Sequence, residues 1–207
     1  IVNMGVISNG TTLLDAGALD SGVATGAMTL IKTITASSSA NVTFAHGASS
    51  VVLDNTYSTY LFKYIDVHGQ TDNKDFQVNF RDGSTAYDAT KTSNFYYSYH
   101  NEGGSDTGLV YYADGDVAQS TGVQMLSGSN GAGNDEALSG EMFLYDPSST
   151  TFVKHFIATN NTYHKSDFSQ NRFVAGYCNV TAAIDGVQFT MSSGNIDSGT
   201  FKLYGIK

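Results

Sequence analysis

Few residues of this chain have the spacing that a catalytic or metal site requires. Nucleophilic hydrolysis needs a Ser, Cys or Thr beside a base, often on a Gly-x-Ser-x-Gly turn, and residues 128–131 (GSNG) lack that spacing. The histidines lie farther apart than a local zinc site allows, and there is a single cysteine. The sequence therefore predicts no catalytic residue, no metal site and no cofactor. The histidines are His46, His68, His100, His155 and His164.

The carboxylates of the predicted loops leave two alternatives open. A close pair of them could hydrolyse a glycosidic bond, and residues 114–116 (DGD) or 134–136 (NDE) offer the hard oxygen ligands that calcium prefers, without the spacing of an EF-hand. We expect solvated turn acids, and the sequence does not settle calcium binding. The candidate acids are Asp72, Asp75, Asp82, Asp114, Asp116, Asp135 and Glu136.

Two aromatic runs, residues 95–100 (FYYSYH) and 111–112 (YY), are the best candidates for a binding surface. Neighbouring rings on a strand point to opposite faces of the sheet, so the two faces cannot both be exposed to solvent alone. These rings could pack in a core or against another subunit, which we favour, or they could stack on a sugar. The candidate ligand or subunit contacts are Tyr96, Tyr97, Tyr99, His100, Tyr111 and Tyr112.

The elements that position these rings are predicted to be strands. Apolar and polar residues alternate with a period of two in residues 76–81 (FQVNFR), 187–191 (VQFTM) and 201–204 (FKLY), and no stretch has a convincing apolar stripe at helical spacing. Residues 127–136 are expected to be a flexible loop. The pattern predicts an all-β, antiparallel β-sandwich, jelly-roll-like. Further strands are predicted at 29–36, 41–45, 50–54, 60–68, 95–100, 109–113, 138–145, 151–158 and 172–180.

The chain divides into an extended N-terminal arm or connector, residues 1–27, and a β-sandwich domain, residues 28–207. The arm is rich in small residues, and it either orders against a partner subunit or is a disordered tail. Cys178 lies in a strand-like run, where we expect a buried and inert thiol rather than an intermolecular disulfide.

Composition excludes several partners. The 207 residues, 41% of them hydrophobic, suffice for one sizeable core. A net charge of −9 argues against binding nucleic acid or an anionic membrane, because both need clustered basic residues. No window approaches the length of a membrane-spanning helix, and the start (IVNM) lacks the basic region of a signal peptide.

Several runs at the two ends of the chain carry a resemblance to a known family: residues 28–39 (MTLIKTITASSS), 51–54 (VVLD) and 57–62 (YSTYLF) at the start, and residues 189–207 (FTMSSGNIDSGTFKLYGIK) at the end. They resemble fibre-like or structural proteins of marine tailed phages, of the type found in cyanophages and pelagiphages. The middle is similar at 99–102 (YHNE), 118–120 (AQS), 138–140 (LSG) and 173–177 (FVAGY). The resemblance covers about residues 28–207 and includes no catalytic motif. It implies a place on the surface of a virion and, often, a trimer.

Together these features predict a non-enzymatic virion structural protein, either a tail fibre or appendage or a capsid head-fibre or decoration subunit. It would act in assembly and in host attachment, as a homo-oligomer, with the arm contacting other virion proteins. The alternative is a carbohydrate- or receptor-binding β-sandwich module that recognises a host surface glycan. A polysaccharide depolymerase is the weakest alternative, because no spacing identifies its acid, base or nucleophile.

Overall fold

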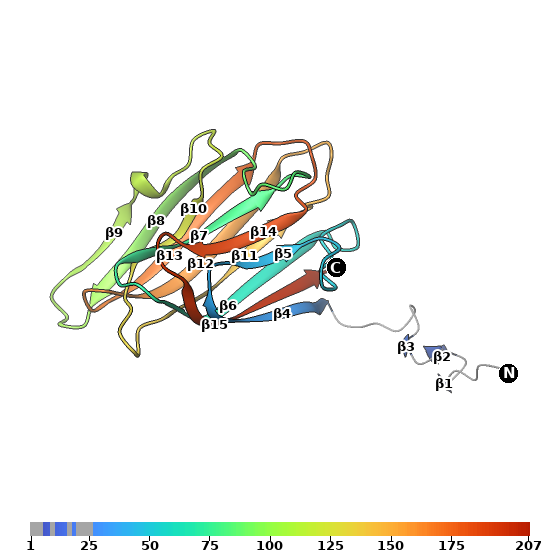
Figure 1. The fold of residues 1–207 in the computed structure, drawn as a ribbon, viewed down its shortest axis with the longest axis horizontal. Helices are drawn as coiled ribbons and strands as arrows, with labels where there is room; N and C mark the ends of the chain where they lie inside the picture. Colours follow the sequence, from blue (N-terminus) through green and yellow to red (C-terminus); the bar gives the residue numbers. More distant parts are fainter. Residues whose placement is uncertain (1–5, 9–10, 16–17, 20–26) are drawn as a thin grey trace.

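The computed structural model describes residues 6–8, 11–15, 18–19 and 27–207, and within these ranges the chain is built of strands, with one 3-10 turn and no α-helix (Figure 1). Three short strands, β1 (Val6–Ser8), β2 (Thr11–Asp15) and β3 (Ala18–Leu19), form an antiparallel sheet of their own. The arm predicted over residues 1–27 falls largely outside the described ranges, so its docking role stays a prediction.

The other twelve strands form one antiparallel sheet, which bends until it is nearly closed, like a barrel. The turn η1 (Ala113–Gly115) follows the edge strand β9. The twelve strands are β4 (Met28–Ser39), β5 (Val42–Ala45), β6 (Thr59–Gly69), β7 (Lys74–Arg81), β8 (Lys91–Asn101), β9 (Thr107–Tyr111), β10 (Gln124–Asn130), β11 (Leu138–Tyr145), β12 (Lys154–His164), β13 (Phe168–Cys178), β14 (Gly186–Met191) and β15 (Ile196–Ile206).

Hydrogen bonding divides these twelve strands into two runs. The long run has the order β4-β15-β6-β11-β12-β13-β8-β9, and the short run has the order β5-β14-β7-β10. A single residue pair, Asn130 and His164, joins β10 to β12 and so links the runs. Four strand pairs are nested along the chain: β4 with β15, β5 with β14, β6 with β11, and β7 with β10. The hairpins β8-β9 and β12-β13 extend the long run beyond β11.

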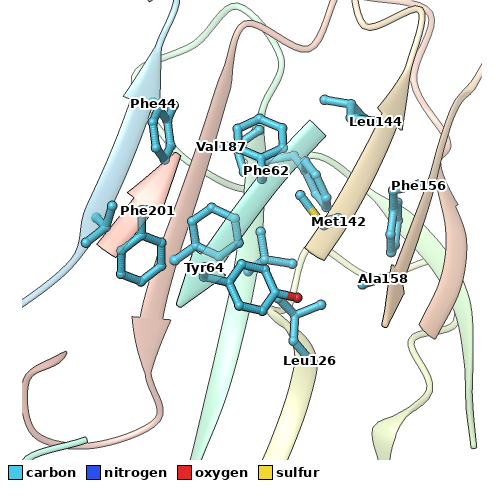
Figure 2. Close-up of a cluster of buried hydrophobic side chains, with 14 of the residues drawn as sticks. Phe44, Phe62, Tyr64, Leu126, Met142, Leu144, Phe156, Ala158, Val187 and Phe201 are labelled. Atoms are coloured by element: carbon cyan, nitrogen blue, oxygen red, sulfur yellow. The ribbon is translucent and has the colours of Figure 1, made fainter. Parts of the chain in front are cut away.

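The core lies between the two runs, whose aromatic rings meet face to edge (Figure 2). The Phe44 ring on β5 lies 5.4 Å from that of Phe62 on β6, and the Tyr64 ring on β6 lies 5.1 Å from that of Phe76 on β7. Each of these four side chains is at most 1% exposed. Because each buried large apolar side chain contributes about 1.5–3 kcal/mol, these contacts hold the two runs together.

The predicted alternation is confirmed. Phe76, Val78 and Phe80 are each 0% exposed, so they form the inward face of β7. Cys178 is also fully buried and free, as expected, and its burial raises the pKa of the thiol to about 12.

Two local predictions are wrong. Residues 50–54 form no strand, because Ser49 and Ser50 adopt the left-handed conformation (φ 50° and 67°), which turns the chain. Residues 127–130, expected within a flexible loop, instead end the strand β10. Their polar groups are satisfied inside the sheet, since the Ser127 hydroxyl donates to Asn130 Oδ1 (2.6 Å) and the Asn130 amide donates to a main-chain carbonyl (2.7 Å). The other predicted strands lie within or overlap observed ones.

Candidate functional site

The six candidate contacts divide between the two faces of the β8-β9 hairpin. Tyr97 and Tyr99 point toward the inside of the molecule with buried Phe95, whereas Tyr96 and His100 point outward, as the strand period requires. Tyr111 lies opposite Tyr96 on the outer face. Tyr112 follows the end of β9, where its N–H donates to the Phe95 carbonyl (3.0 Å) and its ring joins the inner set.

The inner rings surround a buried arginine that the sequence did not single out. The Tyr97 and Tyr112 rings lie 5.9 Å apart, and each lies near the ring of Phe95 (6.4 and 5.7 Å). The Arg172 guanidinium on β13 stands 5.5 Å from the Tyr97 centroid and 5.9 Å from that of Phe95. These are the distances of cation–π contacts, which offset part of the cost of burying the charge.

Arg172 is only 4% exposed, yet its guanidinium is poorly paired. Its Nη2 donates to Gln170 Oε1, its Nε has no hydrogen-bond partner, and it takes part in none of the ion pairs between described residues. Burial lowers the pKa of Arg172 to about 10, against the opposing effect of Tyr97, Asp75 and Tyr112. A buried charge in such a setting is costly, because no carboxylate of the described residues forms an ion pair with it.

A cleft of about 290 Å³, the arginine cleft, opens beside this guanidinium. Burial, together with Arg172 and Lys165, lowers the pKa of His164 at one wall, and Asp75 Oδ1 accepts the Ser129 N–H (3.0 Å) at another. The cleft thus combines a cation, a carboxylate, an imidazole and two phenols. The residues that line the cleft include Asp75, Tyr97, Tyr112, Gly128, His164 and Arg172.

The outward-pointing candidates lie elsewhere. The Tyr96 ring stacks on Phe173 at 4.9 Å with an interplanar angle of 12°, and Tyr111 is 65% exposed, its hydroxyl donating to Asp116 Oδ2 (2.5 Å). That hydrogen bond, with smaller effects of burial and the nearby charge, raises the pKa of Tyr111. The structure therefore does not bring the six residues together into one site.

His100 borders a larger and more open cleft of about 590 Å³, together with Glu102, Ser139 and Tyr163. The Tyr163 hydroxyl donates to Glu102 Oε1 (3.0 Å). This hydrogen bond is the main reason that the pKa of Tyr163 is raised to about 12. Tyr99 does not reach this cleft, since its hydroxyl donates to Asp106 Oδ1 (3.3 Å).

No family model, curated protein or solved structure matches the chain. Across the described ranges no three His, Cys, Asp or Glu side chains are grouped closely enough to hold a metal ion. Nowhere in that same part of the chain is a helix long and apolar enough to cross a membrane.

Arg172 could have been found from the sequence. Counting back from buried Cys178 by twos along one strand passes half-buried Gly176 and then reaches Val174, Arg172 and Gln170, which are buried. The signal was present in the strand period, but the partner rings come from β8, whose pairing with β13 spans distant parts of the sequence.

Proposed function

We propose that residues 28–207 form a jelly-roll sandwich that serves as a non-enzymatic, oligomeric component on the surface of a tailed phage particle. Nested pairing of four strands with four later ones is how a jelly roll is built, as a long antiparallel ribbon folded over on itself. The pairs β4/β15, β5/β14, β6/β11 and β7/β10 support this topology. The resemblance to phage fibre-like proteins supports the location, as a tail fibre, an appendage or a capsid decoration subunit.

The observation that carries the oligomeric part is an apolar surface on the outer face of the long run. One row of directly paired residues crosses five strands, from Ile157 through Phe143, Leu61 and Tyr204 to Leu30. Ile157 (46% exposed) and Leu30 (51% exposed), at the two ends of the row, are open to solvent, whereas Phe143 and Tyr204 are half-buried and Leu61 is buried (4% exposed). Since the exposed ends of the row offer apolar area to a partner, we assign this row, the outer apolar row, to contact between copies of the chain, with a trimer favoured.

Light scattering on the purified chain tests the oligomer. We expect a trimer at micromolar concentration, and Ile157→Lys should release monomers, because a charge would have to be buried at the interface. The matched control is Phe152→Lys, an equally drastic change at a side chain that is 71% exposed and lies outside the row. A well-folded wild-type monomer would count against oligomeric assembly.

Antibody-gold labelling of intact particles tests the location. Label on the head identifies a decoration or head-fibre subunit, and label on the tail identifies a fibre or an adaptor. Absence of label from intact particles, on which an antibody against another surface protein does give label, would refute the virion assignment.

A further inference from the structure

The arginine cleft holds a buried cation whose donors are left without acceptors. A guanidinium has five N–H donors, and the one hydrogen bond that Arg172 makes with described residues goes to Gln170. Nε is enclosed without a partner. Buried side chains of this kind are ordinarily paired, so the cleft lacks acceptor oxygens that a ligand would supply.

A carboxylate faces the guanidinium without neutralising it. A Cβ atom added at Gly128 would lie 2.9 Å from Arg172 Nη1 and 3.1 Å from Asp75 Oδ1, so both groups border Gly128 and lie close to each other. They do not form an ion pair within 4.0 Å. A ligand that contacts both groups from the cleft must therefore accept from the arginine and donate to the aspartate.

We infer that the arginine cleft binds a neutral pyranose sugar, whose adjacent hydroxyls bridge Arg172 and Asp75 while its apolar face packs against the Tyr112 ring. A hydroxyl is both a donor and an acceptor, which an anion or a cation is not. The formal charges of Arg172 and Asp75 cancel, and an added carboxylate would face Asp75. The pyranose therefore fits the pairing better than an acidic sugar does.

The size and the walls of the cleft agree with such a ligand. Its volume of about 290 Å³ suits a single sugar ring rather than a long chain. Tyr97 and Tyr112 supply aromatic walls with hydroxyl groups, and His164 adds a further polar group. Binding of a terminal sugar would let the proposed virion component attach to a host surface, so the inference rests on the proposed function.

Saturation-transfer NMR tests the inference on the whole purified chain, with the methyl glycosides of glucose, galactose, mannose and N-acetylglucosamine as probes and glucuronic acid beside them. We expect at least one neutral glycoside to bind. Gly128→Ala should weaken that binding by roughly tenfold or more, because the added methyl group crowds Arg172 and Asp75 and moves them from their positions while both charges remain.

Two further variants separate binding from folding. Tyr112→Phe removes only a hydroxyl and should weaken binding a few-fold, whereas Tyr87→Phe, the same change at a tyrosine outside the cleft, should leave binding unchanged. Circular dichroism of each variant checks that the fold is retained.

Three results would overturn the inference: binding of none of the neutral glycosides, unchanged binding by folded Gly128→Ala, or binding of glucuronic acid alone. Light scattering on the same samples keeps the two proposals apart. A monomer that binds a glycoside refutes the oligomer and supports the cleft, while an oligomer that binds no glycoside refutes the cleft alone.

Discussion

Buried cations lie at two places along strand β13, beside its last residue and near its middle, and they are hydrogen-bonded in different ways. At one end Lys154 and Lys91 are the direct neighbours of Cys178 on either side, and both are 0% exposed. Lys154 Nζ donates to three main-chain carbonyls at 3.0, 3.2 and 2.8 Å, which uses every proton it has. Lys91 Nζ donates to the carbonyls of residues 122 (2.6 Å) and 121 (3.4 Å).

Near the middle of β13 Arg172 is nearly as deeply buried, but its described hydrogen bonding amounts to one side-chain acceptor. The lysines tie loop carbonyls to the end of the sheet, so the acceptors of their hydrogen bonds come from the fold itself. The arginine stands beside a cleft and a carboxylate with which it forms no ion pair. We therefore expect the lysines to be structural and the arginine to serve the inferred ligand.

The largest expected effect is at Lys154. Lys154→Met keeps most of the side-chain volume but leaves three loop carbonyls without their donor, so we expect the free energy of unfolding to fall by about 3 kcal/mol. Urea titration of the wild type and the variant measures this free energy of unfolding. As a control, Lys63→Met removes an exposed ion pair with Glu141 (3.4 Å, side chains 41% and 39% exposed), and it should change stability by less than about 0.5 kcal/mol. Equal losses in the two variants would show that the carbonyl contacts contribute little.

The next effect is a pH dependence at Lys91. Burial lowers the pKa of Lys91 from 10.5 to about 8. Between these two values the unfolded chain binds more protons than the folded chain, so the contribution of Lys91 to stability must increase as the pH rises through that window. Tyrosines with raised pKa values act in the opposite direction at high pH, and they are present in the variant as well.

The measured quantity is therefore the difference in unfolding free energy between the wild type and Lys91→Met. We expect it to shift in favour of the wild type from pH 8 upward, and to stay constant below pH 7, where the amine is charged in both states. A difference that is flat over the whole range would mean that the amine is not desolvated as its burial implies.

Sequence reasoning succeeded where one strand carries its own signal. The alternation of Phe76, Val78 and Phe80 predicted a buried face, and the setting of Cys178 predicted a buried thiol; both are confirmed. The strand β10 was missed because its end is built from Ser, Gly and Asn, whose polar groups find partners only after the sheet has formed.

The buried cations were missed for a related reason. A charged residue in a strand is expected on the solvent face, since few charged side chains are fully buried. Lys91, Lys154 and Arg172 lie on inward faces, and the register in which strands far apart in the sequence pair sets Lys91 and Lys154 beside Cys178, and Tyr97 beside Arg172. A single sequence does not specify that register. The grouping of Tyr97 and Tyr112 around one cation therefore could not be predicted, although both residues were candidates.

The smallest expected effect on stability is at Arg172, and it is the one that decides the comparison. Replacing a poorly paired buried charge by an apolar side chain of similar length is often neutral or stabilising, so Arg172→Met should change the free energy of unfolding by no more than about 1 kcal/mol. Arg81→Met provides the contrast, because it leaves Asp185 without its 2.8 Å ion pair in a partly buried setting, and we expect it to cost roughly 1–3 kcal/mol. If Arg172→Met is instead as destabilising as Lys154→Met, the arginine is a structural group like the lysines and the two sites along β13 do not differ in kind.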